Sequence, residues 1–261
     1  MLDDTQITQI ANELVEAQRT RTPVPLLTTR YEGMEVADSY AVQRLWAKRN
    51  IDNGRRLVGH KIGLTSKAMQ DATGITEPDY GVIFDDMVFE SGCEVPWQRY
   101  THPRIEVELA FVLGSAISGP SATIFDVLAA TEWVMPALEI LDSHIEMEGR
   151  TIVDTISDNA AMGAMVVGGR PVRPDAIDLR WVSAMVYRNQ TIEETGVSGG
   201  VLGHPATGVA WLANKLAAHD DHLEAGEIIL AGSFTRPLWV EAGDTIVADY
   251  KDLGTVTCQF S

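Results

Sequence analysis

The sequence predicts an α+β protein with a mixed, β-rich core. Of its 261 residues, 45% are hydrophobic and 22% are charged, a composition typical of globular chains. Long helical periodicity is concentrated in the first 55 residues, whereas short β-like segments and glycine, proline or aspartate turns dominate from Arg56 onward. We therefore expect an N-terminal helical cap over residues 1–55 and a β-rich domain over residues 56–261 that holds the functional site.

The N-terminal part is expected to contain two amphipathic helices. Apolar side chains recur at helical spacing over residues 5–19, and Pro23 follows as a helix breaker. A second helix is expected over residues 36–51, with Gly54 as its stop signal.

The remaining part is expected to consist mostly of short strands. The segments with strand character are residues 57–64, 104–113, 134–140, 162–167, 179–188, 228–231, 245–250 and 256–260. Two helices are expected between them, over residues 124–131 and 207–217. A hairpin turn is expected near Asn189.

The charge balance limits the classes of partner. With 37 acidic and 20 basic residues the net charge is −17, which disfavours nucleic acids and anionic membrane surfaces. No apolar stretch approaches the roughly 20 residues that a membrane helix needs. The acidic start does not resemble a signal peptide, and Cys93 and Cys258 lie in no metal or disulfide motif. We therefore expect a reduced, cytoplasmic protein.

Acidic side chains stand out in one expected strand. Glu106 and Glu108 are two residues apart, so they share one face of the strand, and their mutual repulsion favours a divalent cation between them. Glu139 is the single acid in an apolar run over residues 133–141, and burying it alone is costly. The three acids form a candidate Mg²⁺ or Mn²⁺ site. The alternatives are a solvated strand face for the pair and a surface ion pair for Glu139.

Other polar residues are candidates for binding or proton transfer. Lys61 and His60 lie in an apolar strand between two glycines. If Lys61 is half-buried there, we expect burial to lower its pKa. The alternative is that the Lys61 side chain extends to water. Asp79 lies in a turn over residues 77–81 and is a further candidate. The alternative is that it only stabilises the turn, as aspartates often do. Residues 232–237 (GSFTRP) follow a strand and offer backbone N–H groups to an anion, or form a plain turn.

One polar segment is a candidate for a mobile lid over this site. Residues 143–153 contain Gly149 and directly follow the segment that carries Glu139. Residues 154–159, which include Asp158, are polar as well, and helix capping or turn formation is their alternative role.

Seven segments in this order resemble the fumarylacetoacetate hydrolase superfamily, and more narrowly its hydratase and decarboxylase branch. They are residues 59–66, 77–81, 103–109, 136–139, 154–159, 202–205 and 232–237. The resemblance spans nearly the whole chain. It implies a mixed β-roll core with a small N-terminal helical cap, and it implies that Glu106, Glu108 and Glu139 bind Mg²⁺ or Mn²⁺.

The resemblance also implies an activity in the breakdown of aromatic compounds. The expected reaction is the addition of water to a 2-hydroxy-2,4-dienoic acid, the enol form of a 2-oxo acid, to give a 4-hydroxy-2-oxo acid. The alternatives are a hydratase for the five-carbon monocarboxylate, a decarboxylase of the oxalocrotonate type and a non-catalytic partner subunit. A homo-oligomer is expected, as is association with a related pathway enzyme.

Under this hypothesis the candidate residues take different roles. Lys61 is expected to stabilise the enolate or to move a proton, Asp79 to act as the general base, and His60 to act directly or to orient Lys61. Arg236 is expected to bind a distal carboxylate. The residues expected to contact substrate are Ser233, Thr235, Arg236 and Asp158.

Overall fold

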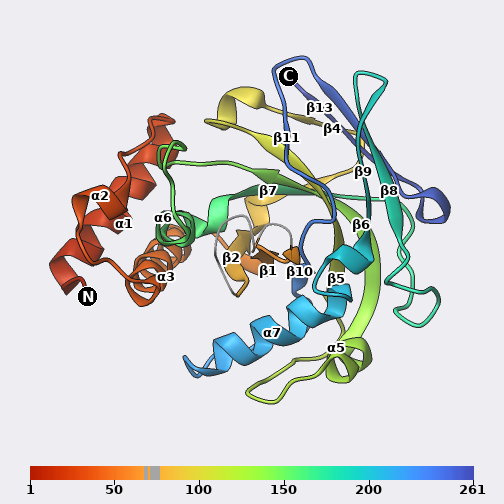
Figure 1. Ribbon diagram of the computed structural model, residues 1–261, viewed down its shortest axis with the longest axis horizontal. Helices are drawn as coiled ribbons and strands as arrows, with labels where there is room; N and C mark the ends of the chain where they lie inside the picture. Colours follow the sequence, from red (N-terminus) through yellow and green to blue (C-terminus); the bar gives the residue numbers. More distant parts are fainter. Residues whose placement is uncertain (68–69, 71–76) are drawn as a thin grey trace.

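The computed structural model describes residues 1–67, 70 and 77–261. Within these residues the strands form two sheets (Figure 1): one of eight strands in the order β2-β1-β10-β5-β6-β7-β3, with β11 beside β5, and one of five strands in the order β4-β13-β12-β8-β9. Parallel and antiparallel pairs both occur. The expected α+β class with a mixed, β-rich core is confirmed.

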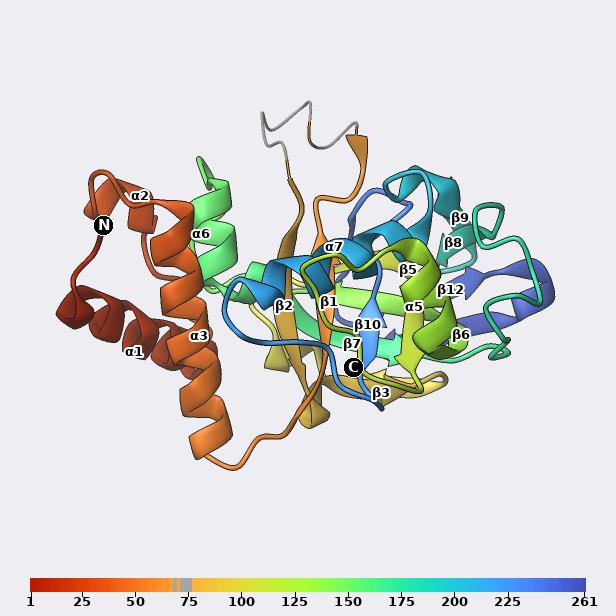
Figure 2. The same cartoon turned by 90° about the horizontal axis from the view of Figure 1, so that it is seen from below.

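The N-terminal helices lie together at one end of the molecule (Figure 2). They are α1 (Asp4–Thr20), α2 (Leu27–Arg30) and α3 (Val36–Asp52). A capping box starts α1, in which the Gln6 N–H donates to Asp3 Oδ1 at 2.8 Å. A further helix, α6 (Ile152–Ser157), packs against α3. The sequence analysis did not predict α6, because six residues are too few for clear helical periodicity.

The large sheet contains the two longest strands of the described chain. Its members are β1 (Leu57–Gly63), β2 (Asp79–Phe84), β3 (Val88–Glu90), β5 (Arg104–Leu113), β6 (Thr131–Leu141), β7 (Met162–Val167), β10 (Ile228–Leu230) and β11 (Leu238–Trp239). Strands β5 and β7 have the predicted bounds, whereas β6 is longer at both ends than expected. Strands β5 and β6 are antiparallel, and Glu106 lies directly opposite Glu139.

The smaller sheet packs against the large one and fixes its central strands. It consists of β4 (Cys93–Val95), β8 (Ser183–Arg188), β9 (Thr191–Val197), β12 (Thr245–Asp249) and β13 (Thr255–Phe260). The expected segment 179–188 becomes a strand only from Ser183, and the hairpin turns at Asn189 as predicted. Tyr250 follows β12 and donates its hydroxyl to the backbone oxygens of Glu108 (2.9 Å) and Ala137 (2.5 Å). This contact holds β5 and β6 where the acids lie.

Two more helices, α5 (Ile124–Ala130) and α7 (Pro205–Ala217), pack against each other beside the large sheet. Pro205 occupies the first turn of α7, where its missing N–H costs nothing. No helix among the described residues combines the length and the apolar character that crossing a bilayer requires.

Candidate metal and substrate site

The three predicted acids meet on one face of the large sheet. Side chains alternate along β5, so Glu106 and Glu108 point to the same side, and Glu139 of β6 faces Glu106 across the strand pair. Their carboxylate oxygens lie within 4.8 Å of one another. Strand alternation and antiparallel register therefore bring the three carboxylates together.

These acids are not a solvated strand face. Glu108 is fully buried and Glu139 is 1% exposed, whereas Glu106 is half-buried and lines a cavity. Burial raises the pKa of Glu106 and of Glu108, and the neighbouring Glu139 raises both further. Burying three acids this close together requires positive charge beside them.

The oxygen atoms of the cluster fit a hard divalent cation. Glu108 Oε2 accepts the Gly232 N–H at 2.8 Å, but no residue that the structure describes donates to the buried Glu108 Oε1. Glu139 Oε1 is buried too, has no hydrogen-bond partner among the described residues, and lies 3.3 Å from the Lys61 ammonium. Carboxylate oxygens that lack donors are the ligands that Mg²⁺ and Mn²⁺ prefer. Glu106, Glu108 and Glu139 therefore fit the predicted metal.

Lys61 projects to the same side as the acids. In β1, Lys61 lies beside Leu230 of β10, which lies beside Ala110 of β5, so the row continues the face of Glu108. Lys61 is 3% exposed and does not reach out to water. Burial acts to lower the pKa of Lys61, but the surrounding carboxylates, Glu139 first, outweigh it and raise the pKa. The sequence-based expectation of a lowered pKa was therefore wrong.

Asp79 joins the group from the start of β2. It lies opposite Gly63 of β1, and it is 1% exposed. A Cβ atom at Gly63 would lie 2.1 Å from Asp79 Oδ1 and 3.2 Å from Lys61 Nζ, so a glycine is required for the two groups to approach. Burial raises the pKa of Asp79, and Lys61 only partly offsets this effect.

His60 is not brought to this cluster. It alternates with Lys61 along β1 and therefore points to the opposite side of the sheet. There its Nδ1 lies 3.0 Å from Glu227 Oε2, and both side chains are buried.

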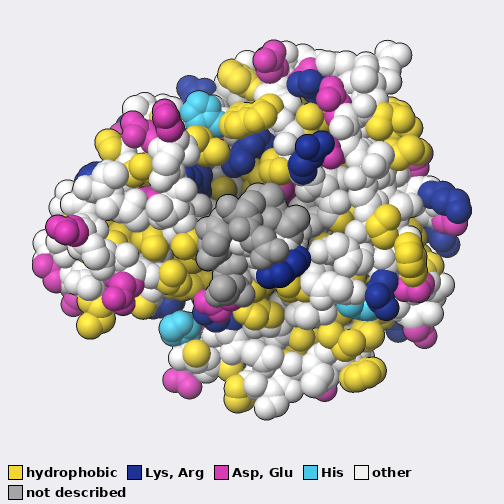
Figure 3. All heavy atoms as spheres, in the orientation of Figure 1, with side chains coloured by type: hydrophobic (Ala, Val, Ile, Leu, Met, Phe, Trp, Pro, Cys, Tyr) yellow, Lys and Arg dark blue, Asp and Glu magenta, His cyan; other side chains and the backbone are white. Residues whose placement is uncertain are grey.

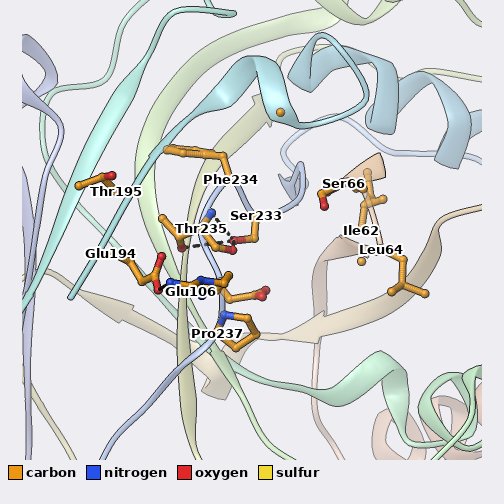
Figure 4. Close-up of a pocket in the computed structure, with 14 residues that line it drawn as sticks. Ile62, Leu64, Ser66, Glu106, Glu194, Thr195, Ser233, Phe234, Thr235 and Pro237 are labelled. Atoms are coloured by element: carbon orange, nitrogen blue, oxygen red, sulfur yellow. Dashed lines mark hydrogen bonds and ion pairs between the residues drawn. The ribbon is translucent and has the colours of Figure 1, made fainter. Parts of the chain in front are cut away.

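The segment 232–237 lines a cavity of about 440 Å³ beside Glu106. Figure 4 shows Ile62, Leu64 and Ser66 on one side of this cavity and Ser233, Thr235 and Glu106 on the other.

The polar side chains of this segment already have partners. Thr235 Oγ1 accepts the Val107 N–H at 3.2 Å, and Ser233 Oγ donates to the Thr235 carbonyl at 2.9 Å. The Arg236 side chain is 80% exposed and pairs with Glu194 at 2.6 Å, so it lies at the rim.

Asp158 lies apart from the residues that line this cavity. Its carboxylate accepts the His144 N–H at 2.7 Å and lies 2.9 Å from His144 Nδ1. The same imidazole lies 3.4 Å from Asp142. Residues 143–145 are buried, and Ile145 forms a β-bridge with Val24. The expectation of a mobile lid was therefore wrong for the first part of residues 143–153.

Sequence reasoning missed two arginines, Arg104 and Arg150, that line a second cavity, of about 300 Å³, on another side of Glu106. Lys61 and Asp79 line it as well. On the face of the molecule shown in Figure 3, basic side chains lie around the middle, although the chain is strongly acidic overall. Arg104 could have been found, because it precedes Glu106 by two residues and shares its strand face.

The fold and the carboxylate site define a class of protein. Residues 53–261 match the family model "Fumarylacetoacetate (FAA) hydrolase C-terminal", and the chain belongs to this family. The predicted resemblance is thereby confirmed.

Comparison with individual proteins narrows the class. The chain is 53% identical over 266 residues to 2-oxo-hept-4-ene-1,7-dioate hydratase of Escherichia coli, with 100% of both chains covered. It is 34% identical to 4-oxalocrotonate decarboxylase of Pseudomonas putida, with 99% and 98% covered. Among solved structures, 4-oxalocrotonate decarboxylase from Pseudomonas putida G7, complexed with magnesium and adipate, matches with a TM-score of 0.97 and 32% identity, covering 100% of this chain and 99% of that one.

Proposed function

We propose that this protein is a metal-dependent hydro-lyase that adds water to a 2-hydroxy-2,4-dienoate, with 2-oxo-hept-4-ene-1,7-dioate as its substrate. The observation that carries the proposal is the group of three carboxylates beside a cavity. Two of their oxygen atoms, Glu108 Oε1 and Glu139 Oε1, have no hydrogen-bond donor among the described residues. The full-length identity of 53% to a hydratase for this substrate supports the reaction type.

Glu106, Glu108 and Glu139 are the residues that would hold the divalent metal, Mg²⁺ or Mn²⁺. Bound there, the ion supplies a Lewis acid that orients the carboxylate and C2 oxygen of the substrate and stabilises negative charge on that oxygen. The half-buried Glu106 lines both cavities and therefore links the metal to the space available for substrate.

Lys61 and Asp79 provide the charge and proton chemistry. Protonation of the dienol at C5 gives a 2-oxo-3-enoate; water then adds at C4, and C3 takes up a proton. Lys61, kept protonated by the carboxylates around it, places positive charge where the enolate forms. Asp79 has a raised pKa, which suits a group that accepts and returns a proton near neutral pH.

Ser233, Thr235 and Arg236 remain candidates for substrate contact along the cavity next to Glu106. His60 and Asp158 remain candidates only for indirect roles, since each is paired with another buried group, Glu227 and His144 respectively.

A decarboxylase is the second candidate, favoured by 34% identity to 4-oxalocrotonate decarboxylase over almost the whole chain. Both reactions act on an unsaturated 2-oxo acid, whose C1 carboxylate and C2 oxygen are common to the two substrates. They differ in product, since one adds water and the other releases CO₂.

The test is to follow the ultraviolet absorbance of the dienoate with purified protein, with Mg²⁺ and with EDTA, and to identify the product. The proposal expects loss of absorbance only with the metal, and a 4-hydroxy-2-oxo acid as product. Release of CO₂ would establish the decarboxylase instead. Absence of metal-dependent turnover would contradict both the hydratase and the decarboxylase. The remaining hypothesis would then be a non-catalytic partner subunit.

We also propose that the chain assembles with copies of itself. Large apolar side chains are exposed, among them Phe125 (77%), Trp181 (73%) and Trp239 (52%). Sedimentation velocity tests this, and a monomer at micromolar concentration would contradict it.

A further inference from the structure

We propose that Arg104 and Arg150 line a pocket that binds the distal carboxylate of a dicarboxylic substrate. This inference rests on the proposed function, and it identifies the residues that select a diacid over a monoacid. It also reassigns the distal carboxylate from Arg236, where the sequence analysis expected it.

Arg104 is directed toward the site by its place in β5. It precedes Glu106 and Glu108 at two-residue spacing, so all three side chains share one face of the strand. Its guanidinium lies over the Trp239 ring, 5.2 Å from the centroid, which fixes its orientation. The Nε atom of Arg104 is buried and has no hydrogen-bond partner in the described part of the chain.

Arg150 reaches the same cavity from the loop before α6. Its side chain is only 7% exposed, and its Nε donates to Thr155 Oγ1 at 3.0 Å. Within residues 1–67, 70 and 77–261, the buried Nη2 atom of Arg150 has no hydrogen-bond partner, and it forms a long ion pair of 3.7 Å with Asp158. That carboxylate already accepts two hydrogen bonds from His144, so it does not satisfy Arg150.

Each of the two partly buried arginines keeps one buried nitrogen atom without a hydrogen-bond partner among the described residues, and an anion would provide that partner. Both guanidiniums line the same cavity, so their positive charges repel each other when no anion lies between them. Leaving a buried donor without an acceptor is unfavourable, because the group has lost its hydrogen bonds to water. A carboxylate offers two acceptor oxygens and matches the planar fork of arginine.

The spacing suits a long diacid. Two residues along a strand advance by roughly 6.6 Å, and this is the expected backbone separation between Arg104 and Glu106, one of the metal-binding acids. Six carbon–carbon bonds link C1 to C7 of the seven-carbon substrate, so its far carboxylate reaches a comparable distance when C1 and the C2 oxygen lie at these acids. A five-carbon monoacid ends earlier and carries no second charge.

Arg236 is a poorer partner for that charge. Its side chain is 80% exposed and already pairs with Glu194 at 2.6 Å. A substrate carboxylate would have to displace Glu194, in a position where solvent weakens the ion pair.

The test compares two substrates on Arg150→Met and Arg104→Gln in the presence of Mg²⁺. The substrates are the seven-carbon diacid and 2-hydroxypenta-2,4-dienoate. We expect KM for the diacid to rise about 30-fold or more in each variant, while KM for the monoacid stays unchanged. The matched control is Arg173→Met, because that side chain is 56% exposed and pairs with Glu132 near the far end of β6.

Other outcomes decide against the pocket. Equal losses on both substrates would assign these arginines to the C1 carboxylate, and a selective loss only in Arg236→Met would return the distal carboxylate to Arg236. No change in either pocket variant would also overturn the assignment.

Calorimetric titration measures the affinity for adipate and for hexanoate, and it needs no turnover. It can therefore be applied to a variant that has lost all activity. We expect the wild-type preference for adipate to disappear in Arg150→Met and in Arg104→Gln. If the wild type turns over neither dienoate, the proposed function fails, and this titration still decides whether the pocket binds a second carboxylate.

Discussion

Two groups of acids in the interior differ in how the hydrogen bonds of their oxygen atoms are satisfied. Around His144, the carboxylates of Asp142 and Asp158 accept hydrogen bonds from the imidazole and from backbone N–H groups. Burial disfavours the charged ring, but the two acids raise the pKa of His144 to about 10. We call this group the His144 cluster.

The second group, the Glu106–Glu108–Glu139 cluster, lies beside Lys61 and contains carboxylate oxygens to which no described residue donates a hydrogen bond. A cluster whose charges and hydrogen bonds are complete stabilises the fold, whereas an incomplete one costs stability until a ligand completes it. The hydrogen-bond partners of the individual carboxylate oxygens thus distinguish the His144 cluster, which is structural, from the Glu106–Glu108–Glu139 cluster, which is a binding site.

The largest expected effect comes from removing a ligand of the incomplete cluster. Glu106→Gln should lower turnover below detection, because one of three charged metal ligands is lost. The measurement is the absorbance assay at saturating Mg²⁺. Turnover near that of the wild type, or full activity in EDTA, would contradict the metal assignment.

The comparison itself is tested by matched amide substitutions in the two clusters. Asp158→Asn should lower the free energy of unfolding by about 3 kcal/mol, since it leaves the charged His144 short of a partner. Glu108→Gln in EDTA should cost nothing or stabilise the protein, since it removes like-charge repulsion. Urea unfolding measures both, and equal destabilisation would erase the distinction between the clusters.

Lys61 is expected to matter for turnover and not for metal affinity. Lys61→Met should reduce kcat about 100-fold, the size of effect typical for groups that stabilise charge or move protons. Magnesium affinity should stay the same or rise, because a cation beside Glu139 has been removed. A weaker metal affinity with unchanged kcat would assign Lys61 a structural role.

The smallest expected effect is the pH dependence of metal binding. The pKa of Glu106 is raised to about 8, so a proton competes with the metal below that pH. Affinity for Mg²⁺ should therefore fall by about tenfold per pH unit as pH decreases from 8. Calorimetric titrations at pH 6, 7 and 8 measure this slope, and an affinity independent of pH would show that the cluster stays ionised.

Much of this site follows from the period of a strand. Alternation places Glu106 and Glu108 on one face, and the apolar run around Glu139 predicts its burial. The same alternation places His60 and Lys61 on opposite faces of their strand. Strand alternation alone therefore argues against His60 acting beside Lys61 in the site.

Other features depend on contacts between distant segments. The pairing of Glu106 with Glu139 is a matter of strand register, which the sequence leaves open. Arg150 and Asp158 lie in a polar stretch, where capping, turn and ligand-binding residues look alike. Only packing of the loop against β5 and His144 distinguishes them.

The central claim, that Glu106, Glu108 and Glu139 hold one divalent ion, is tested most directly by electron paramagnetic resonance of Mn²⁺ titrated into metal-free protein. We predict one bound Mn²⁺ per chain in the wild type and in Lys61→Met, and none in Glu108→Gln at the same concentrations. One Mn²⁺ per chain bound to Glu108→Gln with unchanged affinity would contradict the claim.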